Sequence, residues 1–248
     1  DGWSLVNLHG GFVSSSYSCP DTTNNQPYNL CGDAASFDLT NDLTLPPGPL
    51  YILSCQFFVK PNVRLTIAPG VTVYATPKAE SGNAPALIVE RGGILIADGT
   101  AAAPITFTAL NPEVSSSSVQ TTDTSASSQG VIETRGKWGG LILLGNAPTS
   151  AATPKQIEGI TGKTYGGTDP SDSSGALSYV RVWHGGAVVG ADNEINGITF
   201  GGVGSGTTVD HCEVACNLDD GFEFFGGTVN VKYLSVLFVG DDAFDSDE

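Results

Sequence analysis

The sequence predicts an all-β protein that folds as a single-stranded parallel β-helix, a solenoid of stacked coils, and three observations predict it. Apolar and polar side chains alternate in segments of a few residues that end at Gly, Pro, Asn or Asp. These segments recur at an interval of about 22 residues, as in other stacked architectures. The chain also combines 32 glycines with a charged fraction of only 15%, which is typical of many tight turns and not of surface helices.

The repeat is clearest near the end of the chain. The stretch "VDHCEVACNLDDGFEF" begins at Val209, and "VKYLSVLFVGDDAFDS" begins one interval later at Val231. The positions that correspond at this interval are Val209, Cys212, Val214, Asp219, Asp220 and Phe222 with Val231, Leu234, Val236, Asp241, Asp242 and Phe244. An earlier pair, "LTIAPGVTVYA" and "LIVERGGILIADG", places Leu65 in correspondence with Leu87.

A constant interval favours stacked coils over the other all-β architectures. One coil cannot bury its own apolar face, so we expect successive coils to pair about 4.8 Å apart around inward ladders of aliphatic side chains. An antiparallel sandwich also contains many short strands, but its hairpin connections impose no fixed period.

Length, charge and hydropathy narrow the function classes. The 248 residues suffice for one large domain, and the net charge of −16 would repel nucleic acid and anionic membranes. No apolar run approaches the about 20 residues that span a bilayer, so we expect no membrane insertion. Divalent cations and neutral glycans remain compatible partners. A chain that begins at Asp1, lacks methionine and contains five cysteines is typical of a processed, secreted protein.

Irregular segments mark the expected boundaries of the β-helix and its loop insertions. We expect residues 1–49 to form an N-terminal cap and residues 50–248 to form the β-helix, with loop insertions at about 110–135 and 146–176. The stretch from Ser115 to Gly130 is rich in Ser and Thr, which favours a solvated, mobile insertion or an O-glycosylated loop.

The cysteines suggest disulfides. Cys19 and Cys31 flank a loop rich in Pro, Asn and Thr, so they are a candidate pair. Cys212 and Cys216 could pair only if the chain turns between them, because an extended chain would hold them about 13 Å apart. Because the number of cysteines is odd, Cys55 or another cysteine would have no disulfide partner within the chain. A zinc site with His211 is the alternative for Cys212 and Cys216, but no second pair of cysteines supports it.

The acidic pairs at the end of the repeat suggest a calcium site. At this period the carboxylates of neighbouring coils would lie about 5 Å apart and repel each other unless a cation bridges them. Calcium binds such oxygen ligands, and the candidate ligands are Asp219, Asp220, Glu223, Asp241, Asp242 and Asp245. The alternative is that these side chains point into water at a turn, where screening weakens the repulsion.

The order of several segments resembles a known family. "LTIAPGVTVYA", "ALIVERGGILIADGTAAAPITFTA", "GKWGGLILLGNAP", "LSYVRVWHGG", "NEINGITFGGVGSGTTVDHCEV" and "DDGFEFFGGTVNVKYL" follow one another from about Leu50 to Asp247. This series resembles a large, poorly characterised group of secreted bacterial β-helix proteins, many of which carry a C-terminal sorting domain. The resemblance implies a right-handed parallel β-helix that is secreted or displayed on a cell surface, and it implies no reaction.

A second resemblance supplies the enzymatic alternative. "NLDDG" and "GDDAF" look like the acidic motifs of polygalacturonase-type glycoside hydrolases, in which aspartates on adjacent coils act as general acid and activate water. In that case the protein would be a glycoside hydrolase or a polysaccharide lyase. Its catalytic residues would be Asp219, Asp220, Asp241 and Asp242. Such inverting chemistry needs carboxylates about 6.5–9.5 Å apart, which only a diagonal pair such as Asp219 and Asp242 would satisfy. The net charge of −16 argues against an acidic polysaccharide as substrate.

The remaining candidate side chains favour structural roles. His184 and His211 each follow an alternating segment, so we expect turn or surface residues more than a catalytic base. Trp138 and Trp183 could stack on sugars, but packing is the more common role of tryptophan.

The sequence therefore predicts a secreted, non-enzymatic β-solenoid with a structural or adhesive role at a cell surface or in an extracellular filament. The chain stops within an acidic turn, and an uncovered final coil would expose strand edges. We therefore also expect head-to-tail self-association, with residues 1–49 as the partner surface.

Overall fold

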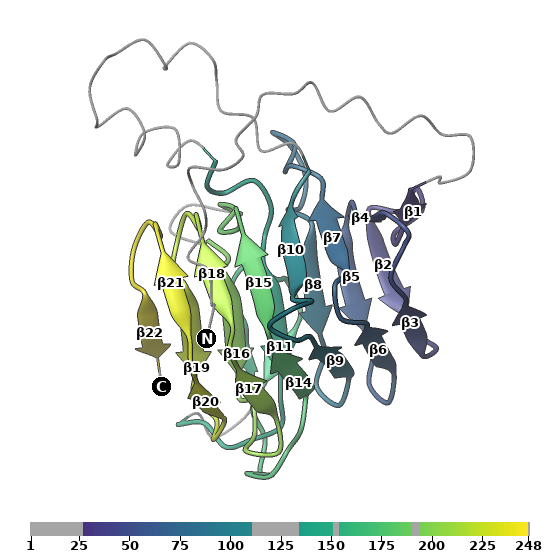
Figure 1. The fold of residues 1–248 in the computed structure, drawn as a ribbon. Helices are drawn as coiled ribbons and strands as arrows, with labels where there is room; N and C mark the ends of the chain where they lie inside the picture. Colours follow the sequence, from purple (N-terminus) through teal and green to yellow (C-terminus); the bar gives the residue numbers. More distant parts are fainter. Residues whose placement is uncertain (1–26, 111–133, 151–153, 190–193, 248) are drawn as a thin grey trace.

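The computed structural model describes residues 27–110, 134–150, 154–189 and 194–247. Cys19, the Ser115–Gly130 stretch and most of the insertion predicted at 110–135 lie outside these residues. Within the described part, the chain forms strands and turns (Figure 1). Among these described residues there is no helix that is long and apolar enough to cross a lipid bilayer.

Three parallel sheets wind around one axis, and the chain passes through them in rotation (Figure 1). Sheet A contains β1 (Tyr28–Asn29), β4 (Tyr51–Leu53), β7 (Thr72–Ala75), β10 (Ile105–Ala109), β15 (Val180–Trp183), β18 (Glu213–Ala215) and β21 (Ser235–Leu237). Sheet B contains β2 (Ser36–Leu39), β5 (Gln56–Val59), β8 (Ala86–Val89), β11 (Leu141–Leu144), β16 (Ile198–Gly201), β19 (Phe222–Phe225) and β22 (Phe244–Asp247). Sheet C contains β3 (Leu43–Leu45), β6 (Arg64–Ile67), β9 (Ile94–Asp98), β14 (Gly175–Ser178), β17 (Thr208–Asp210) and β20 (Asn230–Lys232). This is the right-handed parallel β-helix that the sequence predicts.

The core consists of ladders of inward side chains, one residue from each coil. In sheet C the ladder is Leu45, Ile67, Ala97, Leu177, Val209 and Val231. In sheet B it is Phe57, Leu87, Leu141, Ile198, Phe222 and Phe244. Because period-2 alternation sends every second side chain inward, the ladders fill the interior, and their outward neighbours form the surface.

The predicted repeat interval is confirmed at the end of the chain and wrong earlier. Val209 pairs with Val231, and Phe222 pairs with Phe244. Leu65, however, pairs with Leu95 in sheet C, while Leu87 belongs to sheet B and pairs with Phe57. The loop before β8 lengthens the coil that contains β7, β8 and β9. The similarity between the two stretches therefore matched a strand of sheet C with a strand of sheet B.

The coiling begins before the boundary predicted at residue 49. Strands β1, β2 and β3 each pair in parallel with the corresponding strand of the next coil. The ring of Phe37 stacks on that of Phe57 with centroids 5.2 Å apart. Residues 28–45 thus form a first coil and not an irregular cap, because their few apolar side chains extend the ladders of the next coil.

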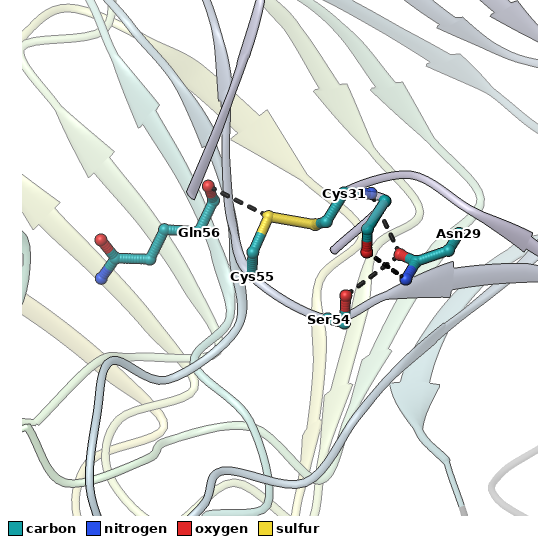
Figure 2. Close-up of a disulfide and its surroundings, with 6 residues drawn as sticks. Asn29, Cys31, Ser54, Cys55 and Gln56 are labelled. Carbon is teal, nitrogen blue, oxygen red and sulfur yellow. Dashed lines mark hydrogen bonds between the residues drawn. A yellow bond between two sulfur atoms is a disulfide. The ribbon is translucent and has the colours of Figure 1, made fainter. Parts of the chain in front are cut away.

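A disulfide fastens this first coil to the second, and it is not the predicted one. Cys31 follows β1, and it bonds Cys55, which lies between β4 and β5 (Figure 2). Their Cα atoms are 6.0 Å apart. Asn29 supports the junction, because its Oδ1 accepts hydrogen bonds from the backbone N–H of Cys31 (3.1 Å) and the hydroxyl of Ser54 (3.0 Å). The predicted Cys19–Cys31 pair is wrong, because stacking brings the later Cys55 beside Cys31.

We expect the Cys31→Ser/Cys55→Ser double variant to lose about 3 kcal/mol of unfolding free energy, because the bond closes a long loop of the unfolded chain. Urea denaturation with and without reductant measures this loss. Reductant should destabilise the wild type by a similar amount and leave the variant unchanged. Equal urea midpoints for all four samples would contradict a stabilising role.

The chain between β11 and β14 folds over the outside of sheet B. Residues 154–166, here called the strap, contain the antiparallel pair β12 (Lys155–Gln156) and β13 (Thr164–Tyr165). The strap lies within the insertion predicted at 146–176. It buries a second apolar cluster outside the coil, made of Phe58, Ala84, Ala86, Ile88, Ile142, Leu144, Ile157, Ile160, Tyr165, Ala187, Ile195 and Phe225.

Candidate metal centre

The acidic residues lie at the corner where the chain leaves sheet A and enters sheet B. Residues 216–221 connect β18 to β19, and residues 238–243 connect β21 to β22 in the next coil. Asn217 is fully buried, and its Nδ2 donates to the backbone oxygen of Asp220 (2.7 Å), which holds the first turn closed. Gly221 permits the close stacking, because a Cβ there would lie 2.7 Å from the backbone oxygen of Ala243.

Five of the six predicted ligands converge in two overlapping groups. The outer triad is Asp219, Asp220 and Asp241, and the inner triad is Asp220, Glu223 and Asp245. Within each triad, one oxygen from each carboxylate lies within 4.8 Å of the other two. Each triad draws on two consecutive coils, because Glu223 of β19 pairs directly with Asp245 of β22.

The sixth candidate ligand, Asp242, contacts the acidic corner through its backbone. Its backbone N–H donates to Oδ1 of Asp220 at 2.8 Å. Its carboxylate belongs to neither triad. Asp242 therefore links the coils through its backbone, and it orients the carboxylate that the two triads share.

Two residues that the sequence analysis missed lie beside the inner triad. Nδ2 of Asn196, from the preceding coil, donates to Oε1 of Glu158 (3.1 Å) and to Oε2 of Glu223. Glu158 belongs to the strap. Neither residue follows the repeat interval, because both lie in irregular segments, so no sequence signal pointed to them.

Asp219 is harder to ionise in the outer triad than in water. Burial raises the pKa of Asp219 to about 6, and the charges of Asp220, Glu194, Glu158 and Asp241 act in the same direction. The pKa of Asp220 is also raised, first by burial, although the N–H of Asp242 partly opposes the shift. The corner thus concentrates negative charge that water screens only in part.

The inner triad shows the same repulsion in stronger form. Burial raises the pKa of Glu223, and the neighbouring Glu158 raises it further through its charge and a hydrogen bond. Asp220 and Asp245 add to this shift. Two carboxyl groups in contact can be stable only with a shared proton or a bound cation.

The donor set fits a hard cation. Every ligand atom of the triads is a carboxylate oxygen, the type that calcium prefers, whereas zinc favours nitrogen and sulfur. One further atom supports the fit. Oδ1 of Asn196 has no hydrogen-bond partner, although the residue is only 1% exposed. A buried acceptor without a donor costs about 1–3 kcal/mol. Nδ2 of the same amide faces the carboxylates, so a cation in the inner triad would contact Oδ1 once the amide has rotated.

The cysteines and histidines near this region do not assemble into a zinc site within the described residues. Cys212 and Cys216 are both free and buried. The predicted disulfide between them is wrong, because the extended strand β18 separates them. Cys212 lies in the central core and Cys216 in a separate apolar cluster. Burial raises the pKa of the Cys212 thiol to about 12, which makes it unreactive.

The histidines occupy corners, as expected, but one of them is not at the surface. His184 and His211 both have positive φ angles, of 65° and 51°. His184 is buried, and loss of hydration lowers its pKa to about 4. His211 stacks between the rings of Tyr179 and Tyr233, with centroids 4.4 and 4.5 Å away.

The tryptophans serve packing. Trp138 is fully buried, and its Nε1 donates to the backbone oxygen of Trp183 at 2.8 Å, so its ring cannot stack on a sugar. Nε1 of Trp183 donates to Oε1 of Glu213 at 2.8 Å. Trp183 itself lies partly exposed on the outer face of sheet A.

Comparison with known proteins agrees with this architecture. The model of a family described as a pectate-lyase-like beta helix domain matches residues 37–248. The match begins within the first coil and includes the whole acidic corner. No curated protein and no solved structure shows a significant match to the chain.

Proposed function

The chain belongs to the pectate-lyase-like β-helix family, and from this fold and its acidic corner we propose a secreted, non-enzymatic β-solenoid that calcium braces. Its role is structural or adhesive, at a cell surface or in an extracellular filament. The disulfide between Cys31 and Cys55 supports an oxidising, extracellular setting.

One observation carries the proposal. Carboxylates from two consecutive coils approach within 4.8 Å of one another, and all of them except Asp241 are buried or partly buried. Such an arrangement is repulsive unless it is neutralised. Calcium takes six to eight oxygen ligands in flexible geometry, so a bound ion would convert this repulsion into a bond between coils.

A braced solenoid suits a mechanical role. The described coils pair with their neighbours in all three sheets, except for the last coil, which contributes only β21 and β22. This pairing makes the stack resist bending and local opening. The net charge of −16 directs association towards cations, basic surfaces and neutral glycans. Head-to-tail self-association stays a prediction, which sedimentation velocity over a range of concentrations tests.

Calcium is expected to raise the melting temperature of the chelator-treated protein by about 5–10 °C at about 100 times its Kd. The Asp220→Asn variant should lose most of this gain, because Asp220 belongs to both triads. Asp98→Asn, at an exposed strand end, is the matched control and should respond like the wild type. Differential scanning calorimetry measures the melting temperatures of all three proteins. If calcium does not change the melting temperature of the wild type, the proposed calcium brace is wrong.

A glycan-active enzyme is the second candidate. Asp219, with a pKa raised to about 6, can hold and donate a proton at mildly acidic pH, as a general acid must. Against this, the oxygens within each triad lie within 4.8 Å of one another, closer than the about 6.5–9.5 Å of inverting hydrolases. Among the predicted catalytic residues, Asp242 lies outside both triads, so a diagonal pair of Asp219 and Asp242 is the arrangement that this candidate requires.

A reducing-sugar assay on a panel of polysaccharides, with and without chelator, separates the two candidates. Turnover that Asp219→Asn abolishes and Asp98→Asn retains would establish the enzyme. Stabilisation by calcium without turnover of any polysaccharide would favour the structural role.

A further inference from the structure

The strap is firmly attached at one end. Nζ of Lys163 lies 2.7 Å from Oε1 of Glu90 and 4.4 Å from the ring centroid of Phe58. Lys60 binds the same Glu90 oxygen at 2.6 Å, and Arg91 donates to the backbone oxygen of Gly166. Opposite charges and hydrogen bonds therefore hold the Lys163 end against the early coils.

The other end of the strap approaches the acidic corner. Gly159 has a φ of +68°, and a Cβ there would lie 2.7 Å from Cγ1 of Ile195. This close approach sets Glu158 beside Asn196, and through Asn196 beside Glu223. Residues 158–160 are here called the strap tip.

The polar contacts of the strap tip are electrostatically unfavourable without a counter-ion. The carboxylate of Glu158 faces Glu223, and Asp219 and Glu194 carry further negative charge nearby. The amide of Asn196 is the donor that lies between Glu158 and Glu223. One neutral amide cannot balance several carboxylates, so apolar packing of Ile157 and Ile160 must offset the repulsion.

We propose that a divalent cation in the inner triad is also bound by Glu158 and by Oδ1 of Asn196, so that it latches the strap tip onto the coil. This inference rests on the proposed calcium site and assigns it two ligands outside the repeat. The latch makes the covering of sheet B depend on calcium.

The ligand count supports this assignment. Asp220, Glu223 and Asp245 supply three carboxylates within 4.8 Å of one another. Glu158 lies outside this group, so it would join by a shift of the strap tip, and with Asn196 it would bring the protein ligands to five. Water or bidentate binding would complete the six to eight oxygens of calcium. Asn196 is 1% exposed and its Oδ1 is unpartnered. Rotation of its amide would turn this oxygen towards the carboxylates, an arrangement that only a cation between them would stabilise.

Hydrogen exchange tests the latch on the whole chain. In the wild type, saturating CaCl₂ should slow exchange of amides within residues 155–165 by about tenfold, while MgCl₂ should have less effect. Glu158→Gln should reduce this slowing to less than about twofold, yet calcium should still raise its melting temperature through the outer triad. Glu80→Gln, on an exposed loop, is the matched control.

Asn196→Asp provides a second, independent variant. An aspartate keeps a ligand oxygen but adds charge, so its strap should exchange faster than that of the wild type without calcium and regain protection with it. If calcium stabilises the wild type but leaves hydrogen exchange of the strap unchanged, the proposed latch is wrong, while the proposed calcium site between the coils still holds. If calcium does not stabilise the wild type at all, both proposals fail.

Discussion

Phe222→Ala is expected to lower the unfolding free energy by about 3–5 kcal/mol, the usual cost of truncating a buried phenylalanine. Phe222 is fully buried in the ladder of sheet B. It pairs with Ile198 on one side and with Phe244 on the other, and its ring lies 5.6 Å from that of Phe244. The cavity would separate two coils next to the acidic corner, so calcium affinity should fall as well.

Phe244→Ala is the matched control for this variant. It removes the same side chain from the same ladder, but Phe244 is 52% exposed. Its loss should be about 1 kcal/mol or less. Urea denaturation followed by circular dichroism measures both variants. Equal losses would mean that the inward ladder does not stabilise the solenoid in the way the packing indicates.

Gly175→Ala is expected to have an effect at least as large, with a loss of more than about 4 kcal/mol or no folded protein. Gly175 begins β14, where the chain returns from the strap into sheet C, and its φ is +116°. A Cβ at this position would lie 1.9 Å from the backbone oxygen of Leu95. Relief of that clash requires β9 and β14 to separate, which opens the coil.

The control for Gly175→Ala separates clash from backbone strain. Gly82 has a similar φ of +105°, but a Cβ there would meet nothing within 4 Å. Gly82→Ala should therefore cost only the about 1–3 kcal/mol of an unfavourable backbone conformation. Soluble yield and urea midpoints compare the two variants, and a Gly175→Ala protein as stable as Gly82→Ala would argue against the close pairing of β9 and β14.

These expectations connect the core to the proposed site. Asp219, Asp220 and Glu223 lie on one coil, and Asp241 and Asp245 on the next. The two sets meet because β19 pairs with β22, which places Glu223 opposite Asp245 and Phe222 opposite Phe244. A ligand that binds both sets therefore stabilises the stacked state by its preference for that state.

The sequence by itself determined the coil type and the positions of the recurring acids. From Val209 onward no insertion interrupts the coils, so an interval read from the sequence equals the interval in space, and Glu223 lies beside Asp245 as the repeat predicts. Alternation of apolar side chains likewise identified the inward ladders, because the direction of each side chain along a strand follows a local rule.

Only the tertiary structure decided what lies beside these elements. It paired Leu65 with Leu95 and Cys31 with Cys55, and it brought Glu158 and Asn196 to the acids. These contacts involve segments whose lengths vary from coil to coil, and in such segments distance along the chain no longer reports distance in space. The physical reason is that stacking fixes the position of every strand, whereas each excursion finds its place by packing onto a surface that exists only after the coils have formed.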